Sequence, residues 1–282
     1  MKIRNGHIAA ITGAGSGIGR ALAMELAKRG CKLAIADING EQLKETAALV
    51  ESTGASCSSC IVDVSDREAV EAFAAAVVKE YGGVDLVFNN AGVTLIDSAD
   101  KVLYSDFEWI MNINFWGVVY GSKAFLPYLR EADAGHIVNV SSLFGLMSLP
   151  LQSAYNASKF AVRGFTESLK MELAGSPIGV SCVHPGGIKT SITENSRIGE
   201  EALTVPKEQV FAEFDKAAIN TAELAAEVII RGVEKNKRRI LIGRDAKIMD
   251  WIVRHFPNSY EKVLGLEKGV RRLYKARAAN KD

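Results

Sequence analysis

The sequence predicts an α/β protein built on one parallel, doubly wound sheet. Short apolar runs of strand length alternate along the chain with helical patterns, an order that is typical of parallel strands covered by helices. Polar residues follow several of the apolar runs, and ligands bind at the carboxyl ends of the strands in such sheets. With 282 residues, of which 48% are hydrophobic, the chain is long enough to bury a core of this kind.

Composition narrows the function. The net charge of +1 gives no indication of a nucleic-acid partner, and no apolar run is long enough to span a bilayer. The first residues lead straight into a strand-like run without a signal peptide, and four scattered cysteines fit a reducing cytoplasm, where we expect the protein. The spacing of Cys57 and Cys60 also occurs in redox and metal sites. Because the sequence offers no second pair of ligands for these two cysteines, we expect their spacing to be coincidental and expect no metal site.

The first strand, at residues 8–12, ends in a glycine-rich turn. Gly13, Gly17 and Gly19 give the spacing G-x-x-x-G-x-G, and a helical pattern follows at residues 20–29. Glycine lets a backbone approach a ligand closely, and the amino end of a helix attracts phosphate. A turn of this kind also occurs for structural reasons alone. Evidence for a ligand therefore has to come from the next strand.

The second strand, at residues 33–36, ends at Asp37, about 18 residues after Gly19. An acidic residue at about this distance accepts hydrogen bonds from the adenosine ribose of NAD and repels the 2′-phosphate of NADP. No cation stands at Ser16 or Ile38 to offset that repulsion. Asp37 could instead cap the helix that begins near Gly40. The two roles are compatible, and we favour the NAD contact.

The alternation continues with helices at residues 41–50 and 68–81 and strands at residues 60–62 and 86–89. Asp63 and Val64 follow the first of these strands, where they could reach the adenine edge. The run Asn89-Asn90-Ala91-Gly92 overlaps the end of the second. Its asparagines could also form a polar turn through their own amides, and both interpretations can hold.

A long helical pattern at residues 105–129 contains Asn112 and Asn114 in apolar surroundings. Because an Asn side chain competes with backbone hydrogen bonds, we expect a kink or a bound water here. Strands at residues 137–140 and 180–184 follow, and Ser141 and Ser142 come directly after the first of them.

Tyr155 and Lys159 lie four residues apart in a helical pattern, so they project from one helix face. A phenol with a pKa of about 10 is a poor base at neutral pH, but a nearby ammonium lowers that pKa. The pair therefore suits proton transfer. The same few residues also fit an ordinary amphipathic helix with a surface Tyr and Lys, and the rest of the chain has to decide.

Several motifs stand in an order and at spacings that are typical of one family. They are Thr12-Gly13-x-x-x-Gly17-x-Gly19, Asn89-Asn90-Ala91-Gly92, Asn114, Ser142, Tyr155-x-x-x-Lys159 and Pro185-Gly186. Over residues 6–243 the chain therefore resembles the classical short-chain dehydrogenases/reductases. The resemblance implies a single Rossmann-like domain for cofactor binding and catalysis at residues 1–243. Residues 244–282 would form a helical extension.

The resemblance also implies a mechanism. Tyr155 would be the general base that takes the alcohol proton while hydride passes to the nicotinamide, and Lys159 would hold the nicotinamide ribose and stabilise the phenolate. Ser142 would position the substrate oxygen, and Asn114 would hold a water that links Lys159 to solvent. The family's spacing from the Tyr selects Ser142 over Ser141.

Two sets of contacts complete the expected site. For NAD they are Gly13, Ser16, Gly17, Ile18, Gly19, Asp37, Asp63, Val64, Asn90, Ala91, Gly92, Tyr155, Lys159, Pro185, Gly186, Ile188 and Thr190. For the substrate they are Ser142, Phe144, Gln152 and Tyr155. Within the first set, Thr190 is expected to meet the nicotinamide carboxamide.

Substrate choice is expected to depend on residues 143–152 and on a lid at residues 191–220. Many side chains in the first segment are apolar, which favours a hydrophobic alcohol or ketone. Core packing or a dimer contact explains the same side chains equally well.

The extension contains an apolar helix stripe, formed by Met249, Ile252, Val253 and Phe256. Residues 247–282 hold nine Lys or Arg against four Asp or Glu. Such a basic amphipathic segment can lie on a membrane surface, or pack on the lid or on a partner subunit. Because the helix is short and its net hydrophobicity modest, we favour packing on the same domain.

We therefore expect an NAD-dependent oxidoreductase that interconverts a secondary alcohol and its ketone, with a hydrophobic substrate. A 3-oxoacyl or diketone reductase on the same fold is an alternative, although such enzymes commonly use NADPH. A non-enzymatic dinucleotide-binding regulator is the alternative from another class. The family assembles through helices that fall here at residues 105–129 and 155–173, so a homodimer or homotetramer is expected. The extension could block one of these interfaces.

Overall fold

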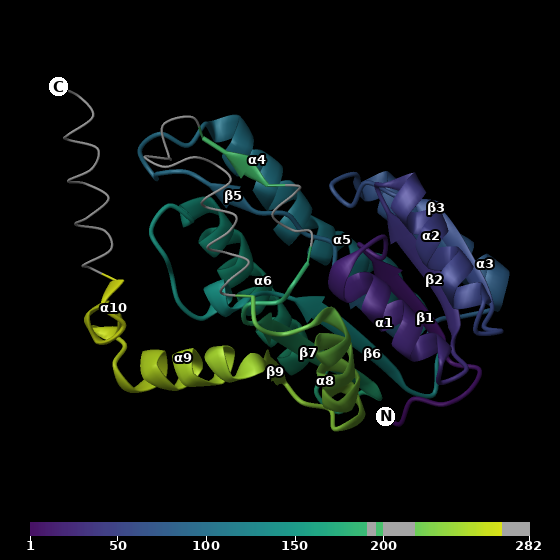
Figure 1. Cartoon of the computed structure of the whole chain (residues 1–282). Coiled ribbons are helices and arrows are strands. Elements are labelled where there is room, and N and C mark those ends of the chain that lie inside the picture. The colour runs from purple at the N-terminus through teal and green to yellow at the C-terminus, as the bar shows by residue number, and fades with distance from the viewer. Residues whose placement is uncertain (191–195, 200–217, 267–282) are drawn as a thin grey trace.

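A computed structural model describes residues 1–190, 196–199 and 218–266 of the chain. Its centre is a seven-stranded parallel sheet in the order β3-β2-β1-β4-β6-β7-β9 (Figure 1). The strands are β1 Ile8–Thr12, β2 Lys32–Asp37, β3 Cys57–Ile61, β4 Leu86–Asn89, β6 Gly135–Val140, β7 Ile178–Pro185 and β9 Arg239–Ile242. The predicted doubly wound sheet is confirmed. Its strand order reverses between β1 and β4, which is where a sheet of this kind opens a crevice for a ligand.

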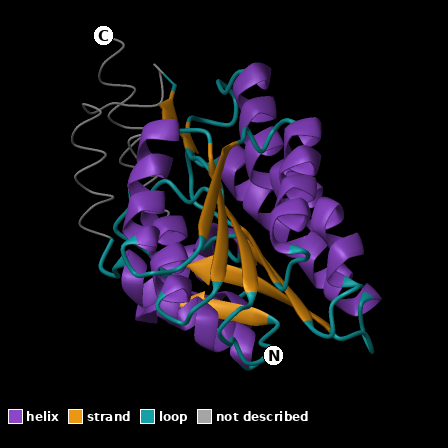
Figure 2. Cartoon of the chain, turned by 90° about the vertical axis from the view of Figure 1, so that its right-hand side faces the viewer, coloured by secondary structure: helices purple, strands orange, loops and turns teal. Residues whose placement is uncertain are grey.

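Helices cover both faces of the sheet (Figure 2). They are α1 Gly17–Ala27, α2 Gly40–Glu51, α3 Arg67–Tyr81, α4 Tyr104–Met111, α5 Gly117–Leu129, α6 Ser153–Glu172 and α8 Ala222–Glu234. One core joins α1 and α8 to the sheet, with Leu26 and Ile229 fully buried. The other joins α3 and α5 to the opposite face, where the rings of Phe73 and Phe125 meet edge to face at 5.8 Å. These two cores fix the carboxyl ends of the strands relative to one another.

Strand β3 differs from the prediction of residues 60–62. It runs Cys57–Ile61, because those residues pair with β2 from Leu33↔Cys57 to Asp37↔Ile61. As an edge strand it leaves its last three residues exposed, so it carries no buried apolar run that would reveal it. Cys57 and Cys60 are three residues apart on this strand and therefore point to opposite faces of the sheet, and both thiols are free.

The long helix expected at residues 105–129 is interrupted. Between α4 and α5, residues Asn112–Trp116 form a π-helix, so the disturbance predicted at Asn112 and Asn114 is present. The first helix also starts earlier than predicted, at Gly17 inside the glycine turn. Helix α8 was not anticipated from the sequence.

Only part of the expected lid at residues 191–220 falls within the described residues. Strand β8, Arg197–Ile198, pairs in parallel with β5, Leu95–Ile96. Arg197 reaches down to α4, where its Nη1 lies 2.6 Å from Asp106 Oδ1 and its guanidinium lies 3.9 Å from the Trp109 ring centroid. The remainder of the lid prediction lies outside the described residues.

The extension begins with α9, Gly243–His255, and continues with α10, Tyr260–Val263. Figure 1 shows α9 running away from the end of β9 towards the edge of the molecule. Of the predicted apolar stripe, Met249, Ile252 and Val253 are partly buried, and Phe256 follows the helix in an exposed position. No helix among the described residues combines the length and the apolar character needed to cross a membrane.

Candidate active site

The glycine turn after β1 packs tightly against two other loops. A Cβ on Gly19 would stand 2.0 Å from Gly13 O, and one on Gly17 would stand 2.9 Å from Thr190 Cγ2. Asn90, after β4, donates from Nδ2 to Gly13 O at 3.1 Å. The turn, the loop after β4 and the loop after β7 therefore meet at the crevice between β1 and β4. A side chain at either glycine would collide with these neighbours.

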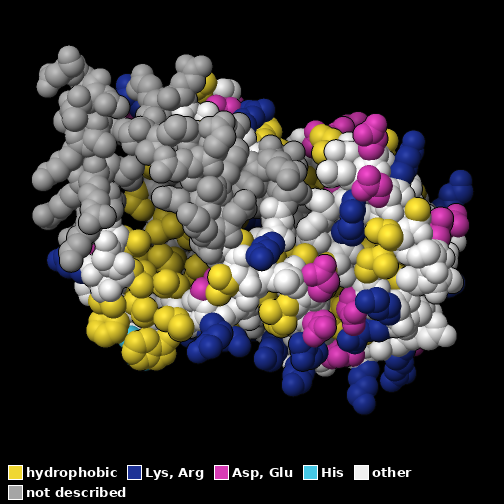
Figure 3. Space-filling model, viewed as in Figure 1, with side chains coloured by type: hydrophobic (Ala, Val, Ile, Leu, Met, Phe, Trp, Pro, Cys, Tyr) yellow, Lys and Arg dark blue, Asp and Glu magenta, His cyan; other side chains and the backbone are white. Residues whose placement is uncertain are grey.

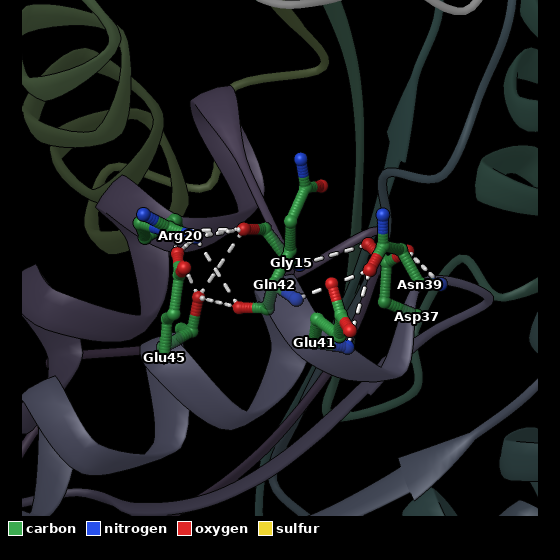
Figure 4. Close-up of polar contacts among 8 residues, drawn as sticks. Gly15, Arg20, Asp37, Asn39, Glu41, Gln42 and Glu45 are labelled. Atoms are coloured by element: carbon green, nitrogen blue, oxygen red, sulfur yellow. Dashed lines mark hydrogen bonds and ion pairs between the residues drawn. The ribbon is translucent and has the colours of Figure 1, made fainter.

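Asp37, at the end of β2, holds the same turn from the other side (Figure 4). Its Oδ2 accepts from Gly15 N at 2.8 Å and its Oδ1 from Asn39 N at 2.9 Å. The helix cap is Asn39, whose side chain accepts from the first backbone N–H groups of α2, so the cap hypothesis for Asp37 is wrong. Each oxygen of Asp37 keeps further acceptor capacity, as a ribose diol requires.

Arg20 is a cation near the turn that sequence reasoning missed. It projects from α1, where Nη2 lies 2.9 Å from Glu45 Oε2 and Nε donates to Thr46 Oγ1 at 2.9 Å (Figure 4). Its guanidinium also donates to Gly15 O. In this structure Arg20 is therefore paired with Glu45, and its Nε and Nη2 donate to groups of the protein.

Other expected cofactor contacts lie farther from the glycine turn or have other partners. Asp63 is exposed, and its Oδ1 accepts from Ser65 N and Ser65 Oγ at 2.9 and 2.7 Å. Val64 is buried against Gly117 of α5. Ile188 pairs with Asn220 just beyond β7. The structure thus brings the glycine turn, Asn90 and Thr190 together and leaves Asp63 in its own surface turn.

The expected reaction centre lies where α6 passes the ends of β4 and β6. The side chain of Ser142 acts on the Tyr155 phenol and lowers its pKa, and the Phe144 ring meets the Tyr155 ring edge to face at 6.1 Å. Lys159 Nζ lies 5.7 Å from the Tyr155 ring centroid and donates to Val140 O at 3.2 Å. Both α6 residues are buried, with 8% of Tyr155 and 3% of Lys159 exposed, so they are not a surface pair on an ordinary amphipathic helix.

Burial is the largest influence on both ionisable groups of this pair. It raises the pKa of the Tyr155 phenol, and the hydrogen bond with Ser142 opposes that rise. It lowers the pKa of the Lys159 ammonium to about 8. The amine therefore stays largely protonated at neutral pH, beside a phenol that gives up its proton only with help from positive charge.

Asn114 is fully buried in the π-helix and links the loop after β4 to α6. Its Oδ1 accepts from Val93 N at 2.8 Å, while its Nδ2 donates to Val93 O and to Ser158 Oγ at 2.9 and 3.1 Å. Both amide hydrogens are thus committed to protein partners. A Cβ on the adjacent Gly92 would lie 3.1 Å from Asn114 Oδ1 and 3.2 Å from Lys159 Nζ, so these groups share one small space.

The segment beyond Ser142 begins with a 3₁₀-helix at Leu143–Gly145. Ser142 caps it, accepting on Oγ from Phe144 N at 3.1 Å. Gln152 is 4% exposed, and its Oε1 has no partner among the described residues. Leu146 and Met147 are buried, which supports the core-packing reading for part of this apolar segment.

His184 is a supporting residue that the sequence analysis did not single out. Burial lowers its pKa to about 4, so the ring is neutral, and its Nδ1 lies 3.0 Å from Ser142 O. Because a carbonyl only accepts, Nδ1 carries the proton and donates. His184 thereby fixes the main chain of Ser142 from β7.

Asp245, in the first turn of α9, is a second missed residue. Its Oδ2 accepts from Gly187 N at 2.7 Å, and a Cβ on Gly186 would collide with its carboxylate. Asn220 donates from Nδ2 to Gly187 O at 3.0 Å. The extension therefore holds the Pro185-Gly186-Gly187 loop in place, and no signal in the family motifs reveals this, because Asp245 lies beyond them.

Replacing Asp245 with Ala should loosen that loop. The N–H of Gly187 loses its charged partner in a partly buried site, so we expect the free energy of unfolding to fall by about 1 kcal/mol and the Kd for NADH to rise several-fold. Urea unfolding and NADH fluorescence titration measure the two effects. Asp245→Asn keeps one acceptor and should fall in between. Unchanged NADH affinity in Asp245→Ala would show that the loop does not depend on the extension.

Comparisons with known proteins agree with this geometry. The family model for short chain dehydrogenases matches residues 7–201. The chain belongs to the short-chain dehydrogenase family. It is 47% identical to SadH of Mycobacterium tuberculosis over 270 residues, covering 94% of this chain and 96% of that protein. It is 33% identical to rat (Rattus norvegicus) estradiol 17-beta-dehydrogenase 11, covering 92% and 83% of the two chains.

A solved structure of a short-chain dehydrogenase from Burkholderia phymatum, in complex with NAD, superimposes with a TM-score of 0.83. It is 32% identical, and the match covers 91% of this chain and 95% of that one. This short-chain dehydrogenase is accordingly an oxidoreductase with a Rossmann-like fold, and the predicted family is confirmed. Members of the family bind small-molecule substrates and form oligomers.

Proposed function

We propose that this short-chain dehydrogenase interconverts a hydrophobic secondary alcohol and its ketone with NAD as the hydride carrier. The observation that carries the proposal is the buried Tyr155 phenol, with the Phe144 ring against it and the Lys159 ammonium 5.7 Å from its ring centroid. A phenol, a hydroxyl and an amine in this arrangement can bind an alcohol oxygen and move its proton.

NAD fits the residues around the crevice. The glycines let the turn after β1 pack directly against the loops after β4 and β7, and the amino end of α1 begins within this turn. Asp37 can accept from the ribose hydroxyls, and the neighbouring Arg20 pairs with Glu45. Bound NAD⁺ would accept the hydride that the alcohol carbon loses. The remaining assigned contacts, from Asn90 to Thr190, would line the same crevice.

The chain's own residues would manage the proton. Ser142, held by His184, donates to or accepts from the substrate oxygen and orients it towards Tyr155. Tyr155 takes the proton of the alcohol in one direction and returns it to the ketone in the other. Lys159 favours the phenolate while it is charged. We assign the water relay of the family to the neighbourhood of Asn114, whose side chain itself is committed to Val93 and Ser158.

The reaction should depend on pH in opposite senses for its two directions. Because burial raises the pKa of Tyr155, alcohol oxidation needs a phenolate that forms only as the pH rises, so kcat/KM for oxidation should increase from pH 6 towards pH 8. Ketone reduction needs the protonated phenol and should fall over the same range. Above the Lys159 pKa of about 8 the loss of its charge should flatten the rise. Steady-state rates in both directions test this, and a flat profile in both would contradict it.

A substrate screen separates the proposed function from its alternatives. Steroids, retinoids, hydroxyacyl esters and small diols are tested as substrates. NADH formation is followed by its absorbance at 340 nm. Turnover of a hydrophobic alcohol with NAD⁺ supports the proposal. A clear preference for NADPH with 3-oxoacyl or diketone substrates favours the reductase alternative, and cofactor binding without any turnover favours a regulator.

We also propose how the chain is organised and where it works. Residues 1–243 would form the catalytic domain, with residues 244–282 packed against it through Asp245 and through Tyr260, whose Oη accepts from Ser148 N at 3.3 Å. A homodimer or homotetramer would form through α4–α5 and α6, where Trp116 and Phe160 are 43% and 38% exposed. The four free cysteines favour the cytoplasm.

A further inference from the structure

Helices α9 and α10 expose large apolar side chains on one side of the extension. Ile248, Trp251, Phe256 and Val263 are 53%, 55%, 41% and 52% exposed. Figure 3 shows apolar side chains gathered at this corner of the molecule, beside a row of Lys and Arg along the lower edge. We call these four side chains the apolar edge. Exposed apolar side chains grouped in this way indicate a surface that binds a partner.

The orientation of α9 fixes which residues accompany the apolar edge. Ala246 is buried, and Asp250 pairs with Arg239 of β9 at 2.6 Å, so this side of α9 faces the protein. At about 100° per residue, Ile248 then lies on the opposite side of α9, and Lys247 and Trp251 lie together on the flank between the two. Arg244, Lys247 and Arg254 are exposed around the apolar edge. The outward side of α9 is therefore both apolar and cationic.

A basic cavity opens beside the same side of α9. Its volume is about 280 Å³, and its lining includes five cations, namely Arg231, Lys235, Lys237, Arg239 and Lys247. Arg231 pairs with Glu227, and Arg239 pairs with Asp250. The three lysines have no ion pair within the described residues, which leaves Lys235, Lys237 and Lys247 available to an anionic ligand.

The charge of this surface decides what occupies it. In a two-fold symmetric dimer through this face, the basic cavities of both copies would approach each other, and their like charges would oppose association. An anionic lipid surface complements both features at once. Apolar side chains of an interfacial helix enter the boundary between headgroups and acyl chains, Trp is favoured at that depth, and Lys and Arg attract anionic headgroups.

We propose that the outward side of α9, the apolar edge and the adjoining basic cavity dock this protein on an anionic membrane surface. This reverses the preference drawn from the sequence, where packing on the same domain alone was favoured. Both contacts coexist: Asp245, Asp250 and Tyr260 hold the inner side of the extension on the protein, and within the described residues the outer side remains exposed. The bond from Ser148 N to Tyr260 Oη also joins the docking surface to the segment beyond Ser142.

Co-sedimentation of the full chain with vesicles tests the docking. With vesicles of phosphatidylcholine and phosphatidylglycerol we expect binding at 50 mM NaCl that weakens strongly at 500 mM, and little binding to phosphatidylcholine alone. Replacing Lys235, Lys237 and Lys247 together with Gln should lower the partition coefficient by roughly 100-fold, or about fivefold per lysine. Trp251→Ser combined with Ile248→Ser should lower it by about tenfold or more and abolish a blue shift of Trp fluorescence.

Matched controls stand at the other end of the sheet. Lys32, Lys44 and Lys79 are exposed, so their replacement by Gln removes the same charge elsewhere, and Ile61→Ser alters an apolar side chain that is 67% exposed. These variants should bind vesicles as the parent does. Unchanged thermal unfolding midpoints show that each variant is folded, and Lys247→Gln alone provides a milder replacement if the triple variant is not.

Four results would overturn the proposal. The first is no sedimentation with anionic vesicles at 50 mM NaCl, and the second is binding that the test variants and the controls affect equally. The third is a Trp251 fluorescence shift that depends on protein concentration without vesicles, which would identify a second copy as the occupant. Retention by an acidic polypeptide such as polyglutamate without vesicle binding would likewise replace the membrane by a protein partner.

Discussion

Tyr155→Phe should reduce kcat for alcohol oxidation by about 10³-fold or more while leaving cofactor affinity within about twofold of the parent. The proton transfer that a positioned acid or base contributes is typically worth about 10² to 10⁴ in rate. Phe keeps the ring that packs edge to face against Phe144, so the fold around the site should survive. Only the hydroxyl is lost.

Single-turnover rates and an NADH fluorescence titration on the same preparation measure the two effects separately. Tyr104→Phe is the matched control, because Tyr104 is 89% exposed at the start of α4 and its hydroxyl has no assigned role. It should behave as the parent. Full activity in Tyr155→Phe would remove the proton-transfer role, whereas lost NADH binding would assign Tyr155 to cofactor binding instead.

Asp37→Asn should raise the Kd for NAD by roughly 10- to 100-fold and reduce the discrimination against NADP. A hydrogen bond to a charged group is worth about 1.5 to 3 kcal/mol, and the neutral amide no longer repels a 2′-phosphate. The amide oxygen can still accept from Gly15 N, as the carboxylate does at 2.8 Å, so the turn itself should stay closed.

Equilibrium titrations with NADH and NADPH provide the ratio of affinities. Asn39→Ala is the control, since it removes the cap of α2 in the same loop and leaves the carboxylate in place. That variant should lose about 1 kcal/mol of stability and keep its preference for NAD. An Asp37→Asn variant with an unchanged ratio would show that another group selects the cofactor, and Arg20 would be the first to examine.

Residues with a distinctive local chemistry made much of this site predictable. A local sequence pattern marks each of them. The glycines of the turn and Asn90 follow buried strands, and Tyr155 and Lys159 lie on one helix face. Strand β3 was misplaced because its residues Cys57–Ile61 form a polar, largely exposed edge. The pairing with β2, which is a tertiary contact, determines its position.

Arg20, His184 and Asp245 escaped prediction for a related reason. Arg20 is an unremarkable helix residue until α2 brings Glu45 to it, and Asp245 matters only because α9 folds back onto Gly187. The electrostatic expectation for Tyr155 was also incomplete. The sequence shows a nearby lysine but not the burial, which raises the pKa of the phenol and lowers that of the amine.

The pairing of β7 with β9 constrains how the protein is made. Cys182 of β7 pairs with Arg239 of β9, and this pairing can form only after the intervening residues have been synthesised. Until then the outer edge of β7 has no strand beside it. An open edge recruits foreign strands. A polypeptide that stops before residue 239 would contain every residue assigned to proton transfer, yet it should aggregate rather than act. The sheet covers the edge of β7 only after β9 has been translated, and a chain released earlier is exposed to aggregation.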